Sequence, residues 1–287
     1  MAGMGTRDIK RKIKSVNNTK QITKAMELVS TAKLRRAKDK VEMTKPYFET
    51  VMETVKNIVQ SETSLRHDYL EHREVNKTLY VVITADRGLC GGYNINALKK
   101  TVADITDANK ATFITIGKKA MSFFRKEEAD IKHEFLYISE KPTYGHAQEI
   151  AQMALKMFEA GEVDEIKLVY TRLVSTISQE PEILKLLPAD VEGDVKELTE
   201  DAEFTTYEPS AEVVLNYLIP KYLESTIYGA LIDSAASEQA ARRVAMENAS
   251  NNAEDMISSL TLTYNQARQA AITQEISEIV GGAEALN

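Results

Sequence analysis

The residues best suited to chemistry are the glycines that follow the first apolar run in the middle of the chain. Residues 79–85 are rich in β-branched side chains, and Gly88, Gly91 and Gly92 come soon after. A strand, a glycine loop and a helix start can together hold a phosphate, because the first N–H groups of the helix are unpaired. The spacing matches neither G-x-G-x-x-G nor a loop ending in G-K-[S/T]. We favour structural glycines in a tight turn and keep a nucleotide-binding α/β enzyme with coiled-coil oligomerisation as the alternative.

Other reactive or metal-binding side chains are few and scattered. Cys90 is the only cysteine, which excludes an internal disulfide and is typical of a reducing compartment. No base lies beside Cys90 in the sequence, so we expect a small packed side chain. His67 and His72 are five residues apart, a spacing that does not place them on one helix face. The sequence therefore predicts no catalytic residue, no metal site and no cofactor.

The segments that position the glycines alternate between strand and helix patterns. Strands are expected over residues 79–85, 111–116, 134–138 and 165–175, and helices over 95–105, 118–128 and 146–160. This alternation predicts a Rossmann-like α/β domain with a mostly parallel sheet. Pro181 and Pro188 bracket one more strand-like segment, and Asn94 is expected to cap the helix that follows the glycines.

The last third of the chain, from about Pro209 to Gly281, is predicted to form a helical run interrupted only by Pro220. After that proline a single glycine, Gly229, precedes Gly281. The segment after Pro220 would extend roughly 90 Å at the rise of an α-helix, longer than any domain this chain could build. Such a helix needs another helix or another protein around most of its length. The alternative is shorter helices folded back on each other, with residues 250–252 as the plausible break.

The first sixty residues predict a basic amphipathic helix. Apolar residues recur mostly at steps of three or four, as in a narrow coiled-coil seam: Ile9, Ile13, Val16, Ile22, Met26, Val29, Ala37 and Val41. Pro46 is expected to bend the chain before a second helix that ends near Gln60. The basic face could serve nucleic acid, but it lacks interleaved aromatic residues, so a solvated or partner-facing surface is favoured.

The charge distribution favours pairing of the two ends. Residues 1–60 carry fourteen Lys and Arg against six Asp and Glu, whereas residues 210–287 carry four against ten. Opposite charges attract, so the first and last helices are expected to lie together. The expected parts are an N-terminal coiled-coil helix and bend (1–60), an inserted α/β foot domain with its connectors (61–208) and a long C-terminal helix (209–287). No secretory signal or run of eighteen apolar residues is found, so we expect a soluble protein.

Five blocks of the sequence resemble the gamma subunit of F-type ATP synthases. They are ITKAMELVS (22–30), DRGLCGGYN (86–94), SEQAAR (237–242), LTYNQARQAAITQE (262–275) and EIVGGA (278–283). The resemblance covers essentially the whole chain and implies the central stalk of a rotary motor. In that family the terminal helices form an antiparallel coiled coil inside a hexamer of alpha and beta subunits. The foot rests on a membrane ring of c subunits and holds the epsilon subunit, and rotation is coupled to ATP synthesis or hydrolysis in the beta subunits.

The resemblance also implies roles for single residues. Arg268 and Gln269 match contacts to a catch loop of a beta subunit, and Arg242 matches another polar contact of the shaft. Met26 lies where the first helix passes the lower part of the beta subunits, a region that affects coupling. Spacing alone favours simple seam packing for Met26 and allows solvated charges for Arg242 and Arg268.

Further implications concern the foot and the setting of the protein. Tyr207 and Glu208 resemble foot residues that face the c ring. Nucleotide binds the hexamer in this family, so no direct nucleotide binding and no catalysis by this chain alone are expected. The paired regulatory cysteines of chloroplast members are missing, so thiol switching is not expected. The match begins near Met1, which favours a bacterial protein peripheral to the cytoplasmic face of the cell membrane.

Overall fold

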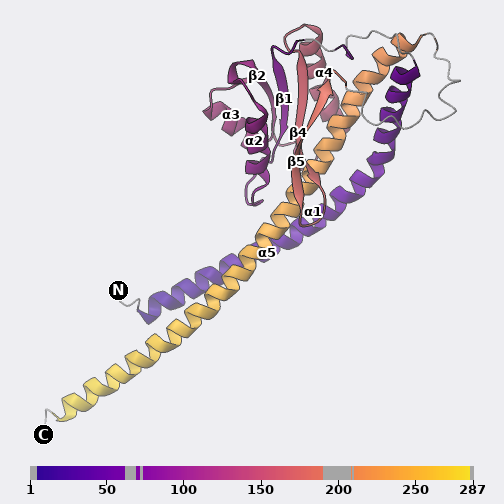
Figure 1. The fold of residues 1–287 in the computed structure, drawn as a ribbon. Helices are drawn as coiled ribbons and strands as arrows, with labels where there is room; N and C mark the ends of the chain where they lie inside the picture. The colour runs from indigo at the N-terminus through magenta and orange to yellow at the C-terminus, as the bar shows by residue number, and fades with distance from the viewer. Residues whose placement is uncertain (1–4, 62–68, 72–73, 190–207, 209, 285–287) are drawn as a thin grey trace. The chain divides into compact units, whose positions relative to one another are not determined.

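The computed structural model describes residues 5–61, 69–71, 74–189, 208 and 210–284. The chain divides into two compact units. The first holds the described residues up to Ser30 and from Arg243 onward, and the second holds the described residues from Thr31 to Arg242. Two long helices contribute to both units: α1 (Thr6–Ser61) and α5 (Ala211–Glu284), drawn in Figure 1. The domain limits expected from the sequence stay a prediction.

A five-stranded sheet in the order β3-β2-β1-β4-β5 forms the centre of the second unit. Four strands are parallel and the fifth is antiparallel to β4. The strands are β1 (Thr78–Ile83), β2 (Ala111–Ile116), β3 (Asp130–Phe135), β4 (Glu165–Leu173) and β5 (Gln179–Leu187). Between them lie α2 (Tyr93–Asp104), the short helix η1 (Ala108–Lys110), α3 (Lys118–Lys126) and α4 (Tyr144–Glu159). The prediction of a Rossmann-like domain with a mostly parallel sheet is confirmed.

The strand β1 is buried along its whole length because helices cover both faces of the sheet. Leu79, Val81 and Ile83 pack with α4, the start of α5 and the end of α1. Tyr80 and Val82 point to the other face and pack with α2 and α3. A strand buried on both sides reads as a continuous apolar run, which explains why this one is readily recognised in the sequence.

Neither Pro46 nor Pro220 ends its helix, which corrects the separate second helix expected after Pro46 and the interruption expected at Pro220. Each proline lies inside a single continuous helix. A proline in a helix interior costs about 3 kcal/mol through a lost hydrogen bond and a steric clash. Two buried residues near each one offset that cost: Val51 and Val55 in α1, and Leu215 and Ile219 in α5, belong to the core of the second unit. Burying one such side chain contributes about 2 kcal/mol, so the packing outweighs the proline.

In the first unit α1 and α5 pack side by side and antiparallel. The hydroxyl groups of Thr23 and Ser250 are hydrogen-bonded at 2.7 Å, and Lys20 Nζ lies 3.0 Å from Glu254 Oε1. As residue numbers rise along α1, those of the partners fall along α5, so the helices run in opposite directions. The predicted pairing of the terminal helices is confirmed, and α5 continues unbroken through residues 250–252.

The seam of α1 in this unit differs from the expected one. Ile22 and Val29 are 62% and 54% exposed, whereas Thr23 and Ser30 are buried. Thr23 and Ser30 are seven residues apart, the repeat of a coiled coil, and their small side chains allow close approach of the partner helix. A search for apolar residues alone therefore selects the wrong face at this point.

Candidate functional site: the carboxyl edge of the sheet

Asp86 holds together three strand ends at the carboxyl edge of the sheet. It follows β1, and its Oδ1 accepts hydrogen bonds from the backbone nitrogens of Lys118 at 3.1 Å and Tyr137 at 3.0 Å. Its Oδ2 accepts a hydrogen bond from Ser139 Oγ at 2.8 Å. Because Lys118 follows β2 and Tyr137 follows β3, one carboxylate fixes the ends of all three strands. Both oxygens of the Asp86 carboxylate therefore accept hydrogen bonds from other residues of the same chain.

The glycine loop after Asp86 forms a tight turn. Gly91 has a φ of 57°, in the left-handed region that glycine adopts without strain. Gly92 is the residue that caps α2, with no side-chain cap. Asn94, expected to cap this helix, instead lies inside it and is buried. Its Oδ1 accepts a hydrogen bond from the backbone nitrogen of Ala85 at 2.8 Å, and its Nδ2 donates to Cys90 Sγ at 3.1 Å.

Cys90 is a packed side chain, as expected. It is 1% exposed and lies in a small cluster with Ala85, Tyr93 and Ala241. Burial raises the pKa of its thiol, with Arg242 opposing that shift. A buried thiol with a raised pKa is a poor nucleophile.

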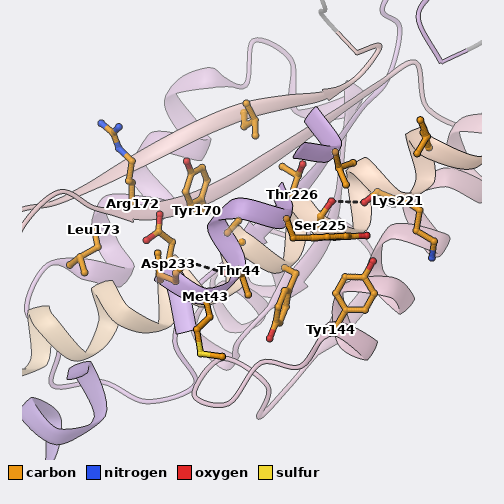
Figure 2. Close-up of a pocket in the computed structure, with 18 of the residues that line it drawn as sticks. Met43, Thr44, Tyr144, Tyr170, Arg172, Leu173, Lys221, Ser225, Thr226 and Asp233 are labelled. Atoms are coloured by element: carbon orange, nitrogen blue, oxygen red, sulfur yellow. Dashed lines mark hydrogen bonds between the residues drawn. The ribbon is translucent and has the colours of Figure 1, made fainter. Parts of the chain in front are cut away.

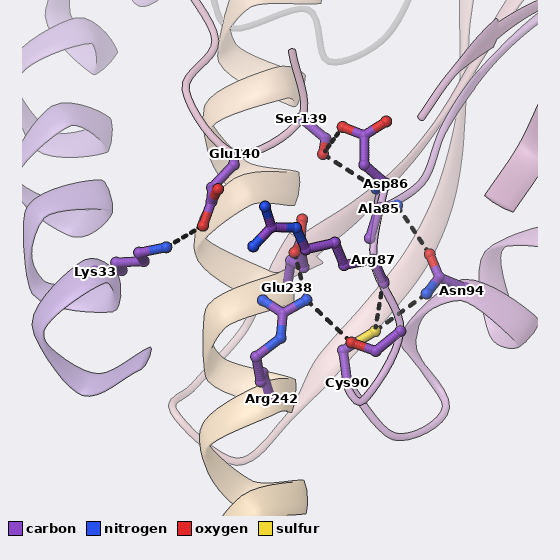
Figure 3. A network of polar contacts seen from close by, with 11 residues as sticks. Lys33, Ala85, Asp86, Arg87, Cys90, Asn94, Ser139, Glu140, Glu238 and Arg242 are labelled. Atoms are coloured by element: carbon purple, nitrogen blue, oxygen red, sulfur yellow. Dashed lines mark hydrogen bonds and ion pairs between the residues drawn. The ribbon is translucent and has the colours of Figure 1, made fainter. Parts of the chain in front are cut away.

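The position that ligands occupy in many open α/β sheets is taken by α5 in this chain. Such ligands bind outside the carboxyl ends of the strands, where the strand order reverses, which here lies between β1 and β4. Ala241 of α5 packs against the glycine loop through Cys90, and Arg242 Nη2 donates to the carbonyl oxygen of Gly88 at 3.4 Å. Figure 3 shows Arg242 directed at this loop. The glycine loop therefore contacts a helix of its own chain at the position where such a ligand would bind.

A buried ion pair lies at this contact. Arg242 Nη2 donates to Glu238 Oε1 at 2.6 Å, and the two side chains are 9% and 4% exposed. Burial raises the pKa of Glu238, and the adjacent Arg242 counteracts the rise. A second ion pair, between Lys33 of α1 and Glu140, lies in the same network in Figure 3. The hydrogen bond from Lys33 lowers the pKa of Glu140.

The second unit also contains a largely apolar groove of about 1160 Å³, shown in Figure 2. Met43, Tyr144 and Tyr170 line it together with residues of α5. Asp233 lies at its wall, and burial raises the pKa of this carboxyl to about 6, against a backbone hydrogen bond from Leu173 and the charge of Arg172. The groove combines an apolar lining with one carboxylate that ionises near neutral pH.

The structure places the site residues expected from the sequence in different environments. Arg268 and Gln269 are exposed on α5 in the first unit, and Met26 is half-buried on α1 in that unit. Arg242 is buried in the second unit. Glu208 is exposed just before α5, and Tyr207 lies outside the described residues. The contacts of these residues with partner subunits stay predictions.

Sequence reasoning missed the residues of α5 that meet the sheet. Ser234, Ser237 and Glu238 are all buried. The signal was present, because residues 234–241 hold two serines and four alanines, a composition that permits close packing of a helix. Within the described residues, no group of three or more His, Cys, Asp or Glu side chains is arranged to hold a metal ion. Among the described helices, none has the length and apolar character needed to cross a lipid bilayer.

Comparison with known proteins places this architecture in one family. The ATP synthase family model matches residues 5–286. The ATP synthase gamma chain of Alkaliphilus metalliredigens is 56% identical over 288 residues, which cover 99% of each chain. The sodium ion specific ATP synthase gamma chain of Acetobacterium woodii is 50% identical over 296 residues, covering 98% of each.

Solved structures show the same fold. A chain in the central stalk and c-ring structure of Tetrahymena thermophila mitochondrial ATP synthase aligns with a TM-score of 0.62 and 25% identity, covering 80% of this chain and 99% of that one. A chain of the Euglena gracilis mitochondrial ATP synthase rotor aligns with a TM-score of 0.69 and 22% identity, covering 93% and 98%. With full-length relatives of this similarity, the chain belongs to the ATP synthase gamma chain family.

Proposed function

We propose that this chain is the central rotor shaft of an ATP synthase and couples ion-driven rotation of a membrane c ring to ATP synthesis and hydrolysis. The family match over the whole length supports this role. The chain is a non-catalytic part of the complex, and the catalysis belongs to beta subunits arranged around it with alpha subunits. The similar chain from Tetrahymena thermophila belongs to a central stalk and c-ring assembly, which supports a c ring as partner here.

The observation that carries the proposal is the exposed surface of the last part of α5. Every described residue from 268 to 282 is exposed. Large apolar side chains are among the exposed residues in this part of the helix: Leu262, Ile272, Ile276, Ile279 and Val280 are between 47% and 71% exposed. An apolar surface of this length on a helix is typical of a binding site for another protein. We assign it to the cavity of an alpha–beta hexamer.

An asymmetric shaft can act on several identical catalytic subunits in turn. A ligand shifts a conformational equilibrium only by its difference in affinity for the two states. The shaft serves as such a ligand, because at any angle it presents a different face to each beta subunit. Rotation then exchanges the nucleotide affinities of the beta subunits, and by reciprocity nucleotide binding drives rotation.

The proposed contacts lie along both helices. Arg268 and Gln269 are exposed and suited to a polar loop of a beta subunit. We assign Met26 to the part of the first helix that passes the lower part of the beta subunits. Arg242 already has two partners inside the chain, so a further contact to a beta subunit would use the small exposed part of its side chain.

The foot of the shaft is assigned to the membrane side. We assign Tyr207 and Glu208 to contacts with the c ring, and the α/β domain to contacts with the epsilon subunit. This arrangement puts the protein at the cytoplasmic face of a bacterial cell membrane as a peripheral subunit. One close relative is described as sodium ion specific, so assays of coupling should supply both Na⁺ and H⁺.

The test is assembly of the chain with purified alpha and beta subunits. The chain alone should hydrolyse no ATP, and its addition should yield a stable complex with ATPase activity. Calorimetric titration of the chain with ATP and NADH should show no binding, since α5 fills the crevice at the carboxyl edge. Failure to co-purify with alpha and beta subunits contradicts the proposal, and tight binding of either nucleotide would favour the enzyme alternative.

A substitution at Arg268 sharpens the assignment. Arg268→Ala should lower coupled ATP synthesis about tenfold, which corresponds to about 1.4 kcal/mol, with normal assembly. Arg35→Ala removes the same charge from another exposed position and serves as the control. Equal loss of synthesis and assembly in Arg268→Ala contradicts a specific role in coupling.

A further inference from the structure

Residues 231–242 of α5, called the joint below, are enclosed by the rest of the second unit. Ala236 and Ala240 pack against Leu34 of α1, with Ala37 beside them. Other joint residues face the carboxyl edge of the sheet. A helix covered in this way is held by protein neighbours on several sides.

Two serines of the joint complete the hydrogen bonding of β4. The pairing of β1 with β4 ends at Val169, so β4 continues beyond its neighbour. At Thr171 the backbone nitrogen donates to Ser234 Oγ at 3.2 Å, and Ser237 Oγ donates to the backbone oxygen at 3.0 Å. Buried backbone groups require partners, and here two hydroxyls one helical turn apart replace a neighbouring strand.

Further contacts attach the joint to other parts of the α/β domain. Tyr93, at the start of α2, is buried and packs in one cluster with Ala241 of the joint. Arg242, held by Glu238, reaches the carbonyl of Gly88 in the loop after β1. One short stretch of α5 is thus hydrogen-bonded to β4 and to the glycine loop, and it packs against α2.

We propose that torque passes between the α/β domain and the shaft helix at this joint, and that Ser234 and Ser237 are positioning residues for rotation. The inference rests on the proposed rotor function. Apolar contacts such as Leu34 with Ala240 are non-directional and allow surfaces to slide. Hydrogen bonds weaken steeply when their geometry changes, so the pair at Thr171 resists displacement of β4 along or around α5. Donation in opposite directions fixes both backbone groups of one residue.

The experiment measures the torsional stiffness of the assembled rotor. A bead is attached through Val102→Cys on α2, a position that is 49% exposed, while the native Cys90 is buried. The alpha–beta hexamer is fixed to a surface, and the angular variance of the bead is recorded without ATP. In the double variant Ser234→Ala, Ser237→Ala the variance should rise about twofold, because directional bonds are lost and apolar contacts remain.

The matched control is Ser225→Ala. Ser225 is also buried on α5, but its hydroxyl donates to carbonyl oxygens of its own helix. The angular variance of the bead on the Ser225→Ala rotor should equal that measured for the parent protein. Hydrogen exchange at Thr171 should become faster in the double variant and stay unchanged in the control, which verifies that the intended contact has been removed.

The outcomes separate the joint from the rotor function. Unchanged angular variance in the double variant, together with faster hydrogen exchange at Thr171, would contradict the proposal that these hydrogen bonds transmit torque at the joint. If the double variant fails to assemble, Ser237→Ala alone is measured. An angular variance equal to that of Ser225→Ala would then contradict the proposed role of the joint. Failure of the parent chain to assemble or rotate contradicts the proposed function instead.

Discussion

The two halves of α5 are one continuous helix in opposite environments. In the second unit Ala236, Ser237 and Ala240 are 0% exposed, and the helix there is rich in alanine and serine. In the first unit residues 268–282 are all exposed, although isoleucine and valine recur among them. In the second unit even small residues of α5 are buried by their own chain, whereas in residues 268–282 even the large apolar residues are exposed. The difference indicates which half the chain stabilises itself and which half needs a partner.

The largest contrast is expected from one substitution made in each half. Ala240→Glu places an unpaired charge in a fully buried position and should lower the free energy of unfolding by about 4 kcal/mol. Ala271→Glu lies on the exposed half and should change it by less than about 0.5 kcal/mol. Urea unfolding of the full chain measures both. Similar losses in the two variants would remove the distinction between the halves.

The next contrast uses two neighbouring arginines. Arg242→Ala leaves the buried carboxyl of Glu238 without its cation and should cost about 3 kcal/mol. Arg243→Ala breaks a more exposed pair with Glu247 and should cost about 0.5 kcal/mol. Thermal unfolding of the two variants is the measurement. Equal midpoints would contradict the strong contribution assigned to the buried pair.

The smallest expected effect is a pH-dependent gain in stability when Asp233 is replaced by asparagine. The folded chain keeps the proton of this carboxyl up to about pH 6, whereas the ordinary pKa is 3.8. The stability linked to that proton is therefore present below pH 3.8 and is lost as pH rises through 6. Asp233→Asn, which keeps an acceptor for Leu173, should stabilise the chain by about 1 kcal/mol at pH 7.5, after allowance for partial exposure.

The same variant should show no gain near pH 4, because the carboxyl is then protonated in the folded chain. Unfolding curves at both pH values provide the check. A gain of equal size at pH 4 and pH 7.5 would show that the effect does not come from ionisation of Asp233. Arg172 and Glu182 are the charged groups that act on this carboxyl, and both remain in the variant.

Most of the architecture could be predicted from the sequence because its signals are local. The buried strands are runs of β-branched residues, and the long helix lacks glycine and proline over most of its length. The continuity of α1 and α5 through Pro46 and Pro220 was not predictable in this way. It depends on tertiary packing of residues such as Ile58 and Ile219, which a local pattern does not reveal.

The site was less accessible to sequence reasoning because it depends on contacts between distant segments. Ser237 and Thr171 are 66 residues apart, and Thr23 and Ser250 are 227 apart. Small polar side chains carry no apolar periodicity, so a hydrophobic pattern overlooks them. The family resemblance pointed to Arg242, but only the structure gives its partners, Glu238 and Gly88.

Hydroxyl-radical footprinting of the chain, alone and after assembly with alpha and beta subunits, tests the central claim most directly. Leu262, Ile272 and Ile279 should be modified readily in the isolated chain and strongly protected in the complex. Leu231 is already buried and should be protected in both states. Unchanged modification of the three exposed residues after assembly would contradict a shaft enclosed by partner subunits.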